Sequence, residues 1–238
     1  FLSWANSKAT GKYKLLIFFT HAWGWRGIIQ DFGSDPPTMM TLSTLRKVMD
    51  ASNFRPDILF FDSCIMGNVE TLSELGDIAE YTIAAQTETP LSGIAFEKLL
   101  DYLSKHGATP DRVAKIIPLR YAKDYSRGGD TTRVEGSLDP LSISAFRLKN
   151  WKKFSQHLNQ VLTSIAKIAP LPQIFAEIRG DFASARAIRD NDWYLDLVEM
   201  LRILYSNLDD SKRSEKKQIA ELFFDLGIDS GCKKPGCI

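Results

Sequence analysis

An acid and a thiol follow one strongly apolar run of the sequence. The run "ILFF" spans Ile58 to Phe61, and Asp62 and Cys64 come directly after it. A buried strand that ends in this way brings both side chains to the edge of a sheet, where α/β proteins bind their ligands. A thiolate is a strong nucleophile when a base lies close to it. The pattern favours Cys64 as a nucleophile with Asp62 beside it.

The chain offers three histidines as candidate bases. His21 directly follows the apolar run 13–20 and opens the loop "HAWGWRG". His106 ends a helical pattern, and His157 lies off the apolar face of another, so both are predicted to be solvated surface residues. His21 is therefore the candidate general base for Cys64.

One cysteine and one histidine are a weak signal by themselves. His21 could equally be a packed residue at a strand end, and Cys64 a small buried hydrophobe. The other two cysteines, Cys232 and Cys237, bracket "KKPG" near the end of the chain. They either close a small disulfide or stay reduced in a loop. A zinc site would need two more ligands, which the neighbouring sequence does not provide.

Strands and helices alternate in the first half of the sequence. Strands are predicted over 13–20, 57–62 and 81–86, and helices over 39–52, 66–79, 94–105 and 111–125. This order predicts a parallel sheet with helices on both faces. Neighbouring strands lie about 5 Å apart. We therefore expect His21 and Cys64 to face one cleft at the carboxyl ends of adjacent strands.

The second half is predicted to be mostly helical. A further strand is expected within 140–148, followed by helices that carry one apolar face, such as 154–168. We see no linker that would separate these helices. The chain is predicted to form a single domain over 1–238, with a catalytic α/β core over 1–139 and a further strand and packed helices over 140–238.

Composition excludes some classes of partner. The formal net charge is +1, which gives no field that would attract nucleic acid. No apolar run is long enough to span a bilayer. The chain begins with Phe1 and not with Met, so we expect a processed or trimmed piece, and a missing leader says nothing of the precursor. The sequence gives no oligomeric state.

Several blocks of the sequence resemble the clostripain-like cysteine peptidases, from about residue 1 to about residue 208. The blocks are "YKLLIFFTHAWGW", "DILFFDSCIMGNVETLSEL", "YTIAAQTETPLSGIAFEKLL" and "WYLDLVEML". The family shares the fold of caspases, legumains and gingipains. The resemblance implies a caspase-like, mostly parallel sheet flanked by helices on both faces, with a helical C-terminal portion. From this resemblance we expect the chain to begin inside the domain, without the first strand usual in the family.

The resemblance also implies an endopeptidase with a Cys–His dyad. Such an enzyme acts on protein or peptide substrates, often cuts after arginine or lysine, and is often matured by self-cleavage. Cys64 matches the nucleophile and His21 the general base. The oxyanion would be held by the backbone N–H groups of Cys64 and Ala22. Ala22 stands where the family has glycine, which keeps the N–H but adds a methyl group.

Asp62 matches the carboxylate at the base of the family's pocket for a basic P1 side chain. A buried carboxylate needs a cationic partner, which arginine or lysine would supply. The alternative is that Asp62 caps the next helix, a role that Ser63 could fill equally well. Ser92 stands where relatives often carry a second acid, and Glu88 is close enough to compensate.

The family resemblance bears on the rest of the cleft as well. Trp23 either walls the cleft or packs its own loop onto the sheet. No cofactor is required, although a calcium ion is compatible with the resemblance. Self-cleavage is expected at Arg26, Arg127 or Arg133, and the location at a secreted, periplasmic or cell-surface site of a bacterium.

Two other functions stay open at this point. Ala22 and Ser92 suggest an inactive relative that only binds peptides. A Cys-dependent amidase that acts on small substrates would use the same nucleophile.

Overall fold

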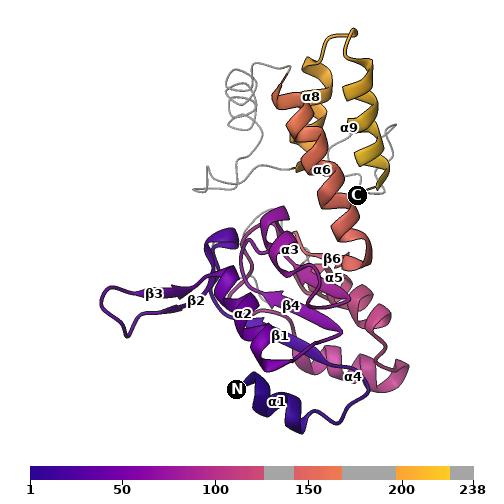
Figure 1. Cartoon of the computed structure of the whole chain (residues 1–238). Helices are drawn as coiled ribbons and strands as arrows, with labels where there is room; N and C mark the ends of the chain where they lie inside the picture. The colour runs from indigo at the N-terminus through magenta and orange to yellow at the C-terminus, as the bar shows by residue number, and fades with distance from the viewer. Residues whose placement is uncertain (126–141, 168–196, 226–238) are drawn as a thin grey trace. The chain divides into compact units, whose positions relative to one another are not determined.

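A computed structural model describes residues 1–125, 142–167 and 197–225 of the chain. It divides into two compact units, Phe1–Trp151 and Lys152–Ile238 (Figure 1). The expected fourth strand belongs to the first unit, so this unit extends beyond the predicted core of 1–139. The single domain over 1–238 stays a prediction.

The first unit is built around a four-stranded sheet. Its strands are β1 (Leu15–Phe19), β4 (Ile58–Asp62), β5 (Tyr81–Ala84) and β6 (Ser144–Arg147), in the order β1-β4-β5-β6. The first three are parallel, and β6 runs antiparallel to β5. The prediction of a mostly parallel sheet is therefore confirmed.

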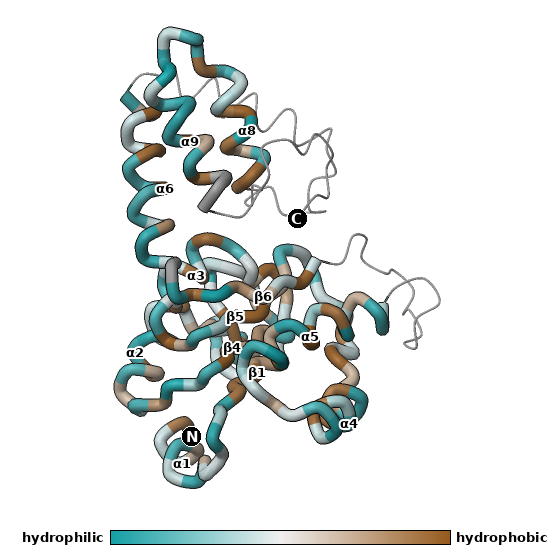
Figure 2. The backbone as a smooth tube through the Cα atoms, turned by 90° about the vertical axis from the view of Figure 1, so that its right-hand side faces the viewer, coloured by the Kyte–Doolittle hydropathy of each residue, from teal (hydrophilic) through white to brown (hydrophobic). Residues whose placement is uncertain are grey.

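Helices cover both faces of this sheet because side chains along a strand alternate between the two faces. Leu59 and Phe61 of β4 pack on the side of α2 (Leu42–Ser52) and α3 (Val69–Leu75). Ile58 and Phe60 pack on the other side, against α4 (Phe96–His106) and α5 (Pro110–Tyr125). Every residue of β4 is buried, which explains its continuous apolar run. Brown, hydrophobic strands lie between the helices in Figure 2.

Polar side chains fix the starts of the two helices that follow the hairpin and β4. The Thr41 hydroxyl accepts a hydrogen bond from the Thr44 N–H at the start of α2. The Asn68 side chain accepts one from the Thr71 N–H at the start of α3. Such N-caps satisfy N–H groups that the helix itself leaves without a partner.

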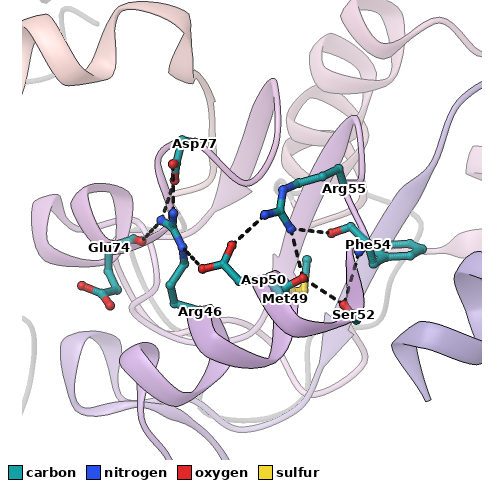
Figure 3. A network of polar contacts seen from close by, with 8 residues as sticks. All are labelled: Arg46, Met49, Asp50, Ser52, Phe54, Arg55, Glu74 and Asp77. Carbon is teal, nitrogen blue, oxygen red and sulfur yellow. Dashed lines mark hydrogen bonds and ion pairs between the residues drawn. The ribbon is translucent and has the colours of Figure 1, made fainter.

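An arginine network joins α2 to the end of α3 (Figure 3). Arg46 donates to the carboxylates of Asp50 and Asp77 and to the Glu74 carbonyl. Arg55 donates to Asp50 from the loop before β4. These contacts are partly exposed, so we assign them a role in orienting α2 and α3 rather than a large share of the stability.

Two features of the first unit were not predicted. Residues 28–40 form a hairpin of β2 (Ile28–Asp31) and β3 (Thr38–Met40) where a loop and the start of a helix were expected. Its strands are too short to show a period, and Gly and Pro residues interrupt the segment. The hairpin extends away from the sheet in Figure 1. A short helix, α1 (Leu2–Lys8), packs its half-buried Leu2 and Ala5 against the core on the α2 side.

The described part of the second unit consists of helices, as expected. These are α6 (Trp151–Ala166, whose first residue belongs to the first unit), α8 (Leu197–Asn207) and α9 (Arg213–Asp225). The buried face of α6 carries Phe154, Leu158, Val161 and Ile165. His157 is not the solvated residue that was expected: its side chain is 23% exposed, and its Nε2 lies 3.9 Å from a carboxylate oxygen of Glu221 on α9.

No helix in the part of the chain that the structure describes combines the length and the apolar character needed to cross a membrane.

Candidate active site

His21 and Cys64 lie at the same edge of the sheet. Because β1 and β4 are parallel neighbours and Phe19 pairs with Asp62, each candidate residue lies two positions beyond a pair of matched strand ends. His21 is exposed and Cys64 is half-buried. Among the described residues, no hydrogen bond joins the His21 ring to the Cys64 sulfur. Catalytic pairs are often this loose before substrate binds.

A tight turn presents Cys64 at the end of β4. Ile65 adopts a left-handed backbone with φ of 58°, which is rare for a β-branched residue. The turn is held to the segment after β5, because the Ile65 N–H donates to the Thr87 carbonyl at 3.0 Å and the Gly67 N–H to the Ala85 carbonyl at 2.7 Å. Strained backbone that is held in place by its surroundings is a common property of catalytic turns.

Within the part of the chain that the structure describes, the Cys64 side chain makes hydrogen bonds with Thr89 alone. The Thr89 N–H donates to the sulfur at 3.4 Å, the Thr89 hydroxyl lies at 3.7 Å, and its carbonyl at 4.0 Å. Thr89 is itself buried. Sequence reasoning did not single out this residue, because nothing in its type or spacing predicts the contact; only its place in the loop after the third strand pointed to the site.

Asp62 is buried, and each of its carboxylate oxygens accepts a hydrogen bond. Only 3% of the residue is exposed. The Ile94 N–H donates to one carboxylate oxygen at 2.9 Å, and the Tyr121 hydroxyl to the other at 3.0 Å. Burial raises the pKa of Asp62, although these two hydrogen bonds oppose the shift. Asn68 caps the next helix, so the capping role considered for Asp62 and Ser63 is excluded.

Gly93 lets the loop after β5 pass directly over this carboxylate. Its φ is +60°, and a Cβ at this position would lie 2.5 Å from an Asp62 oxygen and 2.6 Å from the Phe19 ring. The Tyr125 hydroxyl donates to the Gly93 carbonyl at 2.6 Å. The exposed Ser92 also hydrogen-bonds with Tyr125. Glycine is therefore required where the loop crosses the acid.

Glu88 lies in the same loop, between Thr87 and Thr89. It is half-buried, and within the described residues its carboxylate makes no hydrogen bond with Asp62 or Cys64. The compensation suggested for Glu88 stays a prediction.

The backbone N–H of Ala22, in the loop after β1, takes no part in the hydrogen bonds that join this loop to β2. Ala22 is buried and forms a bridge with Ile28. The hydrogen bonds of this bridge run from the Trp23 N–H to the Gly27 carbonyl and from the Ile29 N–H to the His21 carbonyl. In such an antiparallel pair the central residue keeps its own N–H on the other side. This agrees with a role for the Ala22 N–H as a donor to substrate.

Trp23 lies beside the candidate base. Its ring centroid is 6.1 Å from that of His21, in a tilted arrangement, and the residue is half-buried. Both roles considered for it, in the cleft wall and in packing of the loop, fit this position.

The remaining candidates are His106, Arg26 and four residues outside the described ranges. The His106 ring is exposed and stacks on Tyr102 of α4. Arg26 is exposed at the end of a short 3-10 helix (Gly24–Arg26). Residues Arg127, Arg133, Cys232 and Cys237 lie outside the described ranges. Among the described side chains, no group of three or more His, Cys, Asp or Glu could hold a metal ion.

A sequence model of the clostripain family matches residues 1–226 of the chain. The chain belongs to the clostripain family, a family of cysteine peptidases. No curated protein matches the sequence.

Solved structures of C11 cysteine proteases share the fold of this clostripain-family chain. A secreted protease from Bacteroides thetaiotaomicron, solved with an irreversible peptide inhibitor, aligns with a TM-score of 0.60 and 20% identity over 91% of this chain and 58% of that one. An inactive zymogen from Parabacteroides distasonis gives 0.58 and 14% identity over 92% and 57%. A B. fragilis cysteine protease gives 0.53 and 18% over 79% and 71%. The chain thus spans less than two thirds of the first two proteases.

Proposed function

We propose that this clostripain-family protein is an endopeptidase in which Cys64 and His21 act as a catalytic dyad on protein or peptide substrates. The observation that carries the proposal is the pairing of Phe19 with Asp62, since it brings both candidate residues to adjoining ends of parallel strands. His106, the other histidine of the first compact unit, is the last residue of α4.

The chemistry is an acyl transfer in two steps. The Cys64 sulfur attacks the carbonyl carbon of the scissile peptide bond, and the thiol proton goes to His21. The histidine then gives this proton to the leaving amine as the C–N bond breaks, which leaves a thioester on Cys64. A water molecule, deprotonated by His21, hydrolyses the thioester and restores the thiol.

Backbone N–H groups stabilise the oxyanion that forms in each step. We assign this role to the N–H groups of Cys64 and Ala22. The Cys64 N–H does not take part in the hydrogen bonds that hold the turn, which come from Ile65 and Gly67. The bridge to Ile28 likewise leaves the Ala22 N–H unused. Donors that are fixed in advance in this way cost little reorganisation during the reaction.

Asp62 selects a basic P1 residue in this proposal. Its buried carboxylate receives two hydrogen bonds but no cation within the described residues, and a substrate arginine or lysine would supply the missing positive charge. Gly93 is the residue that separates this acid from the Phe19 ring. Ser92 and Glu88 complete the loop that faces the substrate.

Maturation and location follow the solved relatives. One of these is described as secreted and another as an inactive zymogen. We propose export from a bacterial cell and activation by self-cleavage for this protein as well.

Reporter peptides with Arg, Lys or Glu at P1 test the function directly. We expect the purified protein to hydrolyse the Arg and Lys reporters, and Cys64→Ala to abolish turnover. His106→Ala is the matched control and should leave the rate unchanged, because His106 lies on α4 away from the strand ends. Binding of the peptides without turnover would contradict the proposal and favour the inactive relative. Hydrolysis of small amides alone would favour the amidase.

A further inference from the structure

Thr89 places its N–H, its hydroxyl and its carbonyl within hydrogen-bond distance of the Cys64 sulfur, although the two residues are 25 positions apart in sequence. We propose that Thr89 is a positioning residue that stabilises the Cys64 thiolate by donating two hydrogen bonds, one from its backbone N–H and one from its hydroxyl. The proposal rests on the assignment of Cys64 as the nucleophile.

Two of the three contacts support a role on the thiolate, while the third, from the thiol to the Thr89 carbonyl at 4.0 Å, is made only when the sulfur carries its proton. A backbone N–H can only donate, so the 3.4 Å contact makes the sulfur an acceptor. The hydroxyl at 3.7 Å can donate or accept, and it donates once the sulfur carries a negative charge. Donors to the ionised form of a group favour that form. The proton that leaves Cys64 goes to His21 or to water, and Thr89 keeps its own.

The loop that carries Thr89 is held firmly from the β6 side. The Ser142 hydroxyl accepts from the N–H groups of Gln86 and Thr87 at 3.1 and 3.2 Å. In return the Ser142 N–H donates to the Thr87 hydroxyl at 3.2 Å. Together with the bond from Ile65 to the Thr87 carbonyl, these contacts fix the backbone two residues before Thr89. A fixed backbone keeps the Thr89 N–H directed at the sulfur, so the loop does not have to become ordered when the thiolate forms.

Thr89 and His21 therefore have different roles at Cys64: Thr89 stabilises the thiolate, and His21 is the base. Among the described residues the sulfur makes hydrogen bonds with Thr89 and none with the His21 ring. Thr89 stabilises the sulfur whenever it is ionised, and His21 takes the thiol proton when substrate draws the pair together. The role of Thr89 is thus not a duplicate of the role of the base.

Alkylation of Cys64 by iodoacetamide measures this role without peptide turnover. The rate is followed by mass spectrometry of the peptide that contains Cys64, in the wild-type chain and in Thr89→Val and Thr89→Ser. We expect Thr89→Val to slow alkylation at pH 7 by about two- to tenfold, the factor that one hydrogen bond commonly contributes. Thr89→Ser keeps a hydroxyl and should restore most of the rate.

A second pH separates thiolate stabilisation from packing. At pH 10 ordinary thiols are ionised without help, so the rates of wild type and Thr89→Val should converge. The matched control is Thr82→Val, which removes a buried hydroxyl that has no hydrogen-bond partner among the described residues and should leave alkylation unchanged. Circular dichroism verifies that each variant is folded, and Thr89→Ala replaces Thr89→Val if the latter is not.

Two results would overturn the proposal: an unchanged or faster alkylation of Thr89→Val at pH 7, or a loss that persists undiminished at pH 10. Failure of the proposed peptidase function gives a different result. In that case every variant lacks peptide turnover, while the alkylation rates still decide whether Thr89 stabilises the thiolate.

Discussion

The candidate side chains at the sheet edge are held by residues from distant parts of the chain. The Cys64 sulfur contacts Thr89, and the Asp62 carboxylate accepts hydrogen bonds from Tyr121 and from the Ile94 N–H. Cys64, His21 and Asp62 carry a thiol, an imidazole and a carboxylate, which are common catalytic and binding groups. Their candidate roles could therefore be predicted from the sequence alone. Thr89 and Tyr121 have no such signature, because their roles depend on where a loop and a helix pass in the folded chain.

Replacement of Asp62 should change the dependence of stability on pH. Burial raises the pKa of Asp62 above its ordinary value, so in the pH window between the unfolded and the folded pKa the folded chain binds more protons than the unfolded chain. The free energy of unfolding therefore falls as pH rises through this window. Asp62→Asn has no buried carboxylate to ionise, so its stability does not fall for this reason. Its amide can still form hydrogen bonds with the Ile94 N–H and Tyr121. We expect its stability relative to wild type to increase from pH 4 to pH 7 in urea unfolding.

The control for this experiment is Asp101→Asn, because Asp101 is an exposed partner of Lys105 on α4. It should leave the shape of the pH curve close to that of wild type. A difference between wild type and Asp62→Asn that is constant across this pH range would show that Asp62 is not desolvated in solution.

The same carboxylate should control P1 preference. Asp62→Ala removes the negative charge that would pair with a substrate arginine in a desolvated site, so we expect kcat/KM for the Arg reporter to fall on the order of a hundredfold. Alkylation of Cys64 by iodoacetamide should fall much less. Equal losses for Arg and Glu reporters would remove Asp62 from this role.

At the scale of elements, most strands and helices could be predicted from the runs and the spacing of apolar residues. The strand β4 was predictable because burial on both faces demands continuous apolar residues. The outermost strand β1 is only partly buried, but its run of apolar residues is continuous as well, and β5 is fully buried. The β2–β3 hairpin was not predictable, since its strands have only four and three residues. The loop after β5 could be placed, but its crossing over Asp62 depends on the backbone of Gly93.

Gly93→Ala tests this crossing. A methyl group there would meet Asp62 and the Phe19 ring at a backbone angle that disfavours alanine. We expect the free energy of unfolding to fall by about 2 kcal/mol or more, from the left-handed backbone and the overpacking together. Gly11→Ala is the matched control, because a methyl group at Gly11 has a single neighbour at 3.4 Å and no positive φ. Equal stability of the two variants in urea unfolding would contradict the close packing over Asp62.

At the scale of the whole molecule, the site residues discussed here belong to the first compact unit, Phe1–Trp151. The sequence predicted the helical character of the later part from its apolar stripes, such as Phe154 to Ile165 on α6. It could not predict the division after Trp151, because residue patterns that define a helix do not state which neighbouring element it packs against.

Self-cleavage is the prediction that belongs to this scale. If the protein cuts after basic residues, its own exposed Arg26, or Arg127 or Arg133, should be its first substrate, since nicking concentrates in exposed loops. We expect incubation of the intact chain to yield one new amino terminus after one of these residues, identified by sequencing. Nicking of Cys64→Ala at the same place would show that another protease makes the cut.

The central claim is that His21 serves Cys64 as its base, and hydrolysis of the Arg reporter by His21→Ala tests it most directly. Loss of a general acid–base group commonly lowers the rate by a factor of about 10² to 10⁴. We therefore predict that kcat falls by at least about a hundredfold in His21→Ala, while His106→Ala stays at the wild-type rate. A folded His21→Ala protein that keeps kcat within about threefold of wild type, well short of this range, would contradict the account.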